Sequence, residues 1–133
     1  MCRSSAGAER LTLANNKGID FNPGRKNPLV LYGNALELQF ADGTFDFLYT
    51  NIMDHISDWP KFLGEVKRVL RPGTGIFFND LDQNEMDAFA VHDSVKERPQ
   101  LEALMGAKFC KVSQRKVFDE KDPGKHFYVY SSV

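Results

Sequence analysis

The chain has few of the features that mark specialised classes of protein. Its 133 residues include two cysteines, Cys2 and Cys110, which form no CxxC pair and no disulfide framework. This cysteine usage favours a reducing compartment. No apolar run approaches the roughly 20 residues of a membrane-spanning helix, and the N-terminal residues lack the apolar core of a signal peptide. We therefore expect a cytoplasmic protein with no membrane contact.

An excess of charge of one sign is also lacking. The formal net charge is -1, and no five consecutive residues carry the same charge, so no nucleic-acid partner is indicated. His92 and His126 have no neighbours at the spacing of metal ligands, and we expect no metal. These absences leave an ordinary globular protein whose partners are not selected by bulk charge.

Short strand-like runs that alternate with helix-like runs are what the sequence does contain. Hydrophobic residues make up 42% of the chain, enough for one core, and we expect residues 1–133 to form a single domain. The alternation predicts an α/β fold with a mainly parallel sheet. Turn residues divide the expected strands, which span residues 18–21, 29–32, 45–50, 75–79, 109–117 and 126–130. The last two form an antiparallel C-terminal hairpin.

The clearest predicted helix spans residues 58–70. Asp58 is a suitable N-cap, and Pro60 lies in the first turn, where its missing N–H does no harm. The apolar residues of this segment repeat at helical spacing and predict one buried face. They include Phe62, Leu63, Val66 and Leu70.

Three further local expectations follow from composition. A second helical region, from residue 84 to about residue 105, is expected to break near Pro99 and to end with Gly106 as its C-cap. The strand at 29–32 is apolar throughout, which predicts a strand covered on both faces. Residues 5–16 predict a weak N-terminal helix.

Three segments carry a family resemblance. Residues 33–46, GNALELQFADGTFD, resemble the "GDAxxLPFxDxSFD" stretch of class I S-adenosylmethionine (SAM)-dependent methyltransferases. Residues 62–73, FLGEVKRVLRPG, resemble the family's "F-x-x-E-x-x-R-V-L-[KR]-P-G-G". Residues 18–20 resemble the acidic end of its second strand. The chain is identified as a methyltransferase type 11-like member, which implies a Rossmann-like methyltransferase fold and SAM as cofactor.

The resemblance also implies a cofactor site. Asp20, followed by Phe21, corresponds to the ribose ligand, since an acid at a strand end can accept hydrogen bonds from both ribose hydroxyls. Asn34 stands where the family usually has an Asp that contacts the adenine amino group, and Ala35 and Leu36 would border the ring. The residues alone leave another interpretation open, in which Asp20 and Asn34 serve only to cap turns.

Two later residues are candidates for the reactive end of the site. Asn51 follows a strand at the edge where doubly wound sheets bind ligands, and it would face the methionine part of SAM or the substrate. His55 would contact a substrate or act as a base; alternatively, it packs against the next helix. No catalytic residue is assigned, because methyl transfer depends on positioning more than on a fixed catalytic set.

The first strand and the Gly-rich loop of the family have no counterpart here, and residues 1–17 resemble only the remnant of that loop and its helix. In the family this strand lies between those corresponding to 18–21 and 45–50. Three outcomes are open: Leu11–Leu13 replaces it, the outer strands close up, or a second chain or another protomer fills the gap. We expect a methyltransferase acting on an unknown small-molecule or protein acceptor. The alternative is a non-catalytic methyltransferase-like subunit, or a truncated form, that acts through a protein partner.

Overall fold

The computed structural model describes residues 16–81, 91–92, 96–116 and 126–132. Expectations that fall on residues 1–15, including the N-terminal helix and the Leu11–Leu13 strand, lie outside the described part. The described elements follow in the order β1 (Gly18–Asp20), β2 (Val30–Tyr32), β3 (Phe47–Thr50), the 3-10 helix η1 (Met53–His55), α1 (Trp59–Val69), β4 (Ile76–Leu81), α2 (Arg98–Lys108), β5 (Phe109–Lys116) and β6 (His126–Ser132).

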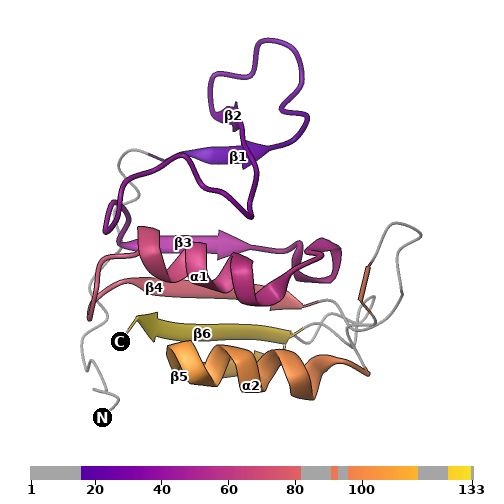
Figure 1. The fold of residues 1–133 in the computed structure, drawn as a ribbon, viewed down its shortest axis with the longest axis vertical. Coiled ribbons are helices and arrows are strands. Elements are labelled where there is room, and N and C mark those ends of the chain that lie inside the picture. The colour runs from indigo at the N-terminus through magenta and orange to yellow at the C-terminus, as the bar shows by residue number, and fades with distance from the viewer. Residues whose placement is uncertain (1–15, 82–90, 93–95, 117–125, 133) are drawn as a thin grey trace.

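The strands form two sheets. β1 and β2 pair in parallel, with Asp20 opposite Tyr32. The second sheet has the order β3-β4-β6-β5 (Figure 1). In it β3 and β4 are parallel, whereas β6 runs antiparallel to β4 and β5. The predicted α/β fold with parallel strands and an antiparallel C-terminal hairpin is therefore confirmed.

No ladder joins β1 to β3 within the described residues. This is the place where the family's first strand would lie, and Figure 1 shows the β1–β2 pair on the side of β3 that faces away from β4. Of the three outcomes left open by the sequence, the closing up of the outer strands does not occur in the described part of the chain.

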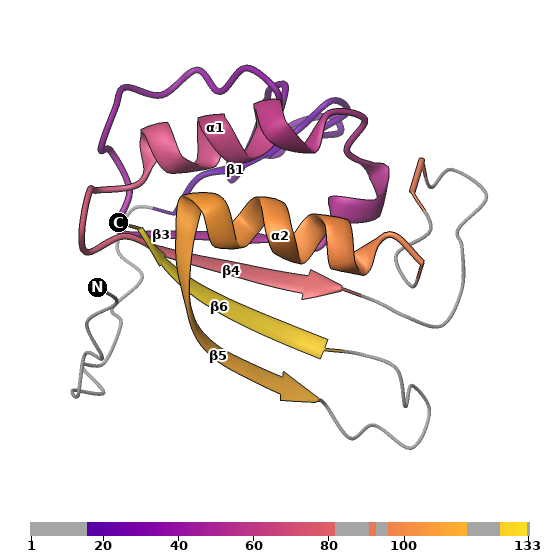
Figure 2. The ribbon, with the colours of Figure 1, turned by 60° about the horizontal axis from the view of Figure 1, so that its bottom comes forward.

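Both α-helices lie on one face of the four-stranded sheet (Figure 2). α1 begins as predicted, because the Asp58 carboxylate accepts a hydrogen bond from the Lys61 N–H at 3.0 Å. Its apolar face is buried against Phe77 of β4, whose ring meets that of Phe62 edge to face. α2 adds Leu101 and Met105 to the same core. Burial of the predicted face of α1 is confirmed at Phe62, Leu63, Val66 and Leu70.

Two expectations are wrong, and another is tested only in part. Pro99 lies in the first turn of α2, where no N–H is needed, so a helix begins near it. Residues 84–90, which the same expectation includes, lie outside the described residues. Gly106 is inside α2 and not its C-cap, because the helix continues to Lys108. β2 is not covered on both faces, since Leu29 beside it is 71% and Tyr32 is 68% exposed.

The expectation that the cysteines form no disulfide is also wrong. Cys110, at the start of β5, is disulfide-bonded, although the sequence spacing gave no indication of a disulfide.

The core assignment can be tested with paired leucine truncations. Leu70 is fully buried, whereas Leu29 is largely exposed. We expect Leu70→Ala to lower the free energy of unfolding by about 2–5 kcal/mol, because the substitution leaves a cavity. Leu29→Ala, the matched control, is expected to change it by less than about 0.5 kcal/mol. Urea unfolding followed by circular dichroism measures both, and equal effects would contradict the assignment.

Candidate functional site

The carboxyl ends of β1 and β2 bring the first two site residues together. The backbone N–H of Gly33 donates a hydrogen bond to the Asp20 carbonyl at 3.0 Å, directly after the β1–β2 ladder ends. A Cβ at position 33 would lie 2.7 Å from Gln39 Oε1 and 3.1 Å from Ile19 Cβ. A side chain at this position would crowd Ile19 of β1 and displace the Gln39 side chain, so glycine suits the place where the chain leaves β2.

Asp20 is exposed and closes a turn. Its Oδ1 accepts a hydrogen bond from the Asn22 N–H at 2.7 Å. The turn-capping interpretation of this residue is therefore confirmed. A carboxylate has further acceptor sites on its two oxygens, so the capped turn presents Asp20 at the strand end with acceptor capacity to spare. The neighbouring Phe21 is 65% exposed and meets Tyr32 edge to face.

Asn34 builds a second turn at the end of β2. Its Oδ1 accepts a hydrogen bond from the Leu36 N–H at 2.9 Å, and its carbonyl accepts one from Glu37 at 3.0 Å. Ala35 and Leu36 are partly buried and pack against the core. The turn role predicted for Asn34 is confirmed, and its side-chain oxygen keeps a second lone pair for a ligand.

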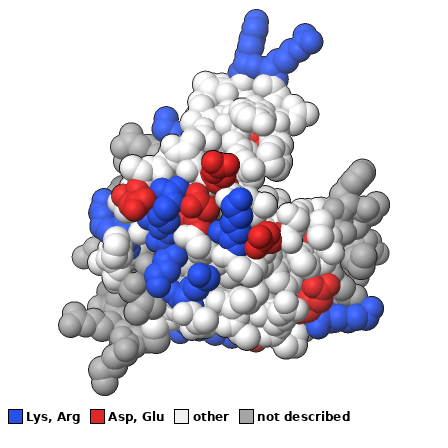
Figure 3. Space-filling view, viewed as in Figure 1, with Lys and Arg blue, Asp and Glu red and all other residues white. Residues whose placement is uncertain are grey.

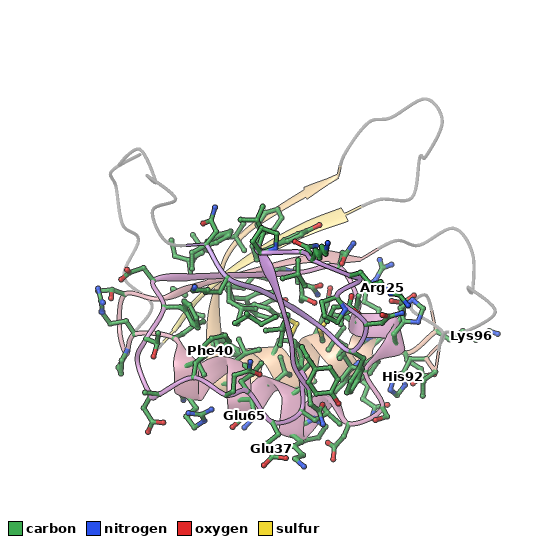
Figure 4. The ribbon with its side chains drawn as sticks, turned by 90° about the horizontal axis from the view of Figure 1, so that it is seen from above. Arg25, Glu37, Phe40, Glu65, His92 and Lys96 are labelled. Carbon is green, nitrogen blue, oxygen red and sulfur yellow. The ribbon has the colours of Figure 1, made fainter. Side chains whose placement is uncertain are left out.

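The loop that follows this turn is held by two side chains of α1. Glu65 Oε2 accepts a hydrogen bond from the Leu38 N–H at 2.7 Å. The Arg68 guanidinium donates to the carbonyls of Leu38, at 2.8 Å, and Phe40, at 2.7 Å. It also donates to Asp42 Oδ1 at 2.8 Å. Figure 4 shows Glu37, Phe40 and Glu65 along α1, and Figure 3 shows acidic and basic side chains gathered over this part of the surface.

Glu65 and Arg68 also bond to each other. The guanidinium Nε meets one carboxylate oxygen of Glu65 at 2.8 Å, and one of its terminal nitrogens meets the other at 2.9 Å. This paired geometry fixes both side chains and is stronger than a bond between neutral groups. The hydrogen bond from Arg68 lowers the pKa of the Glu65 carboxyl below its usual value of 4.5, against a smaller opposing effect of burial. The hydrogen bond with Glu65, followed by that with Asp42, raises the pKa of Arg68.

Two further candidates, Asn51 and His55, follow β3 in the chain. Asn51 is exposed in a bend directly after β3, and in the part of the chain that the structure describes no hydrogen bond joins it to Asp20 or Asn34. His55 ends η1, with its Nε2 at 3.7 Å from Asp54 Oδ2. A backbone hydrogen bond thus joins Asp20 to Gly33, the residue before Asn34.

Trp59, the first residue of α1, contacts both η1 and His92. The Trp59 indole N–H donates to the Met53 carbonyl at 2.7 Å, and its ring stacks on that of His92, with centroids 3.9 Å apart. His92 Nδ1 lies 2.7 Å from Glu97 Oε2. Trp59 is 3% exposed and belongs to the core. Within the described residues, no group of three or more acidic, histidine or cysteine side chains could hold a metal ion, and no helix is long and apolar enough to cross a membrane.

Sequence reasoning did not assign roles to Glu65 and Arg68. Both belong to the "E-x-x-R" part of the family motif, and Arg68 also suits the dipole at the C-terminal end of the helix. Charged residues on the outer face of a helix usually need no special function. The available signal was their spacing, since residues three apart on a helix are neighbours.

The comparisons with known proteins give the family. The sequence model of the family described as "Methyltransferase domain" matches residues 6–78, more than half of the chain. The chain therefore belongs to this methyltransferase family.

A curated relative and two solved structures illustrate the likeness. The demethylmenaquinone methyltransferase of Bacillus velezensis is 38% identical over 61 residues, which are 45% of this chain and 26% of the relative. A SAM-dependent methyltransferase of Methanosarcina mazei has 19% identity and a TM-score of 0.61, with 88% of this chain and 81% of that chain covered. Geranyl diphosphate C-methyltransferase of Streptomyces coelicolor, solved with S-adenosyl-L-homocysteine, has 11% identity and a TM-score of 0.58, with coverage of 78% and 53%. The structural matches support the Rossmann-like methyltransferase fold. The chain spans about a quarter of the length of the B. velezensis relative.

The charge pair predicts a specific pH dependence of stability. Because the pKa of Glu65 is lowered in the folded chain, its stabilising contribution is present above the ordinary carboxyl value and is lost as pH falls through the lowered pKa. We expect the melting temperature of the wild type to exceed that of Glu65→Gln at about pH 6, with the difference shrinking toward about pH 3. Thermal melts at several pH values measure this, and a difference that does not vary with pH would contradict the pairing.

Proposed function

We propose that this chain is the donor-binding part of a SAM-dependent methyltransferase, with the ribose and adenine of SAM at the carboxyl ends of β1 and β2. Membership of the methyltransferase family supports this proposal. The observation that carries it is the hydrogen bond from Gly33 to the Asp20 carbonyl. This bond joins the residue that carries an exposed carboxylate to the residue before the Asn34 turn, and in such folds ligands bind past the carboxyl ends of the strands.

The residues present fit the donor. Asp20 would bind the ribose hydroxyls with the acceptor capacity that its turn leaves unused, and Phe21 would flank the sugar. The Asn34 amide would contact the polar edge of adenine, while Ala35 and Leu36 offer it a partly apolar surface. SAM supplies a methyl group on a sulfonium, and the contribution of these side chains is to bind and orient it.

The reactive end of the site is proposed at the carboxyl end of β3. Asn51 follows that strand and His55 ends the next 3-10 helix, so both lie past a strand end, as ligand-binding residues do in doubly wound sheets. Asn51 would face the methionine part of the donor, and His55 would contact the methyl acceptor, whose identity we leave open.

The donor site is tested by calorimetric titration with SAM and S-adenosylhomocysteine. Asp20→Asn retains one oxygen for the Asn22 N–H, so the turn is preserved, while it removes the charge and replaces the second acceptor oxygen with a donor. We expect it to weaken binding about tenfold to a hundredfold, as the loss of a charged acceptor does. Asp46→Asn is the matched control, because Asp46 is an exposed carboxylate paired with Arg71 at the other end of β3, and its affinity should equal that of the wild type.

Two results would count against the proposal. Binding that survives Asp20→Asn unchanged would refute the ribose site. A wild-type chain that binds neither ligand would refute donor binding and favour the alternative, a methyltransferase-like subunit that acts through a partner.

A further inference from the structure

The loop between the Asn34 turn and β3 contains backbone groups that no strand or helix pairs. The N–H and carbonyl of Leu38 and the carbonyl of Phe40 all bond to Glu65 or Arg68 instead. Unpaired backbone groups in partly buried positions are costly, so these bonds select one position for the loop. Two side chains on α1 therefore determine where residues 38–40 lie.

Because the loop follows the Asn34 turn directly, fixing the loop also restricts the turn. Leu38 is one residue beyond Glu37, whose N–H bonds to the Asn34 carbonyl, and at its other end the turn is joined through Gly33 to Asp20. A short segment attached at both ends has little freedom to move independently. Release of Leu38 from α1 would therefore allow residues 34–36 to shift, although among the described residues neither Glu65 nor Arg68 hydrogen-bonds to that segment.

The chemistry of the pair suits precise positioning. Both oxygens of Glu65 bond to Arg68, and the side chains are only 20% and 31% exposed. The planar guanidinium still has donors left for two carbonyls in fixed directions, which the single ammonium group of a lysine would not reproduce. The position of the loop therefore depends on the directions of these hydrogen bonds as well as on the charge of Arg68.

We propose that Glu65 and Arg68 are positioning residues for the adenine end of the donor site. They hold the segment from Asn34 to Leu36 in the conformation that recognises the adenine amino group. This inference rests on the proposed function, because it takes residues 34–36 to border adenine.

The test compares two ligands that differ only at the base. S-adenosylhomocysteine and its analogue with hypoxanthine in place of adenine are titrated into the wild type, Arg68→Gln, Arg68→Lys and Glu65→Gln. Arg71→Gln is the matched control, since Arg71 lies three residues further on and its side chain pairs with Asp46. A general loss of folded protein weakens both ligands by the same factor, so the ratio of the two affinities isolates positioning from stability.

We expect the wild type and Arg71→Gln to prefer the adenine ligand to the same extent. Arg68→Gln should weaken binding of the adenine ligand about tenfold or more, as small misplacements of binding groups do, and bring the ratio toward one. Arg68→Lys should resemble Arg68→Gln, and Glu65→Gln, which keeps an oxygen for the Leu38 N–H, should lie between.

Each contrary outcome has a distinct meaning. An unchanged ratio in Arg68→Gln, with normal preference in the wild type, would overturn the positioning role and leave the donor site intact. Failure of the wild type to bind either ligand would overturn the proposed function and the positioning role together. If Arg68→Gln does not fold, the ratio measured for Glu65→Gln decides in the same way.

Discussion

The rest of the structure depends on which face α1 turns toward the sheet. The helix buries Phe62, Leu63 and Val66 against the sheet, and this apolar face leaves only one orientation. That orientation directs Glu65 and Arg68, one turn apart, toward the loop that leads from β2 to β3. Burial on one side of α1 and hydrogen bonding on the other are therefore consequences of a single helical register.

The same register connects the core to the candidate site. The loop that α1 holds begins where the Asn34 turn ends, and that turn is joined by one backbone hydrogen bond to Asp20. The site is thus built mainly from turns and backbone groups at the ends of two short strands.

Much of the architecture follows from local sequence signals. Asp58 and Pro60 predict the start of α1, and the spacing of its apolar residues predicts the buried face, because capping and periodicity act over a few residues. The exposure of β2 could not be predicted in this way. An apolar strand is buried only if other elements cover it, and that depends on residues distant in sequence.

In the candidate site, too, some features follow from local sequence signals and others depend on residues distant in sequence. The positions of Asp20 and Asn34 at strand ends follow from the order of the elements and from the family motif. The roles of Glu65 and Arg68 do not, because their partners are backbone atoms more than 25 residues earlier in the chain. The misplaced boundary at Gly106 has a related cause, since packing of α2 on the core overrides the weak local preference of glycine to end a helix.

The most direct test of the account is hydrogen exchange at the backbone amides, measured with and without S-adenosylhomocysteine. If the donor lies at the ends of β1 and β2, the ligand should slow exchange at residues 20–22 and 34–38 and leave α2 unchanged, because only the first two segments would be covered and fixed by it. Slowed exchange confined to other parts of the chain, or no change anywhere at a saturating ligand concentration, would contradict the account.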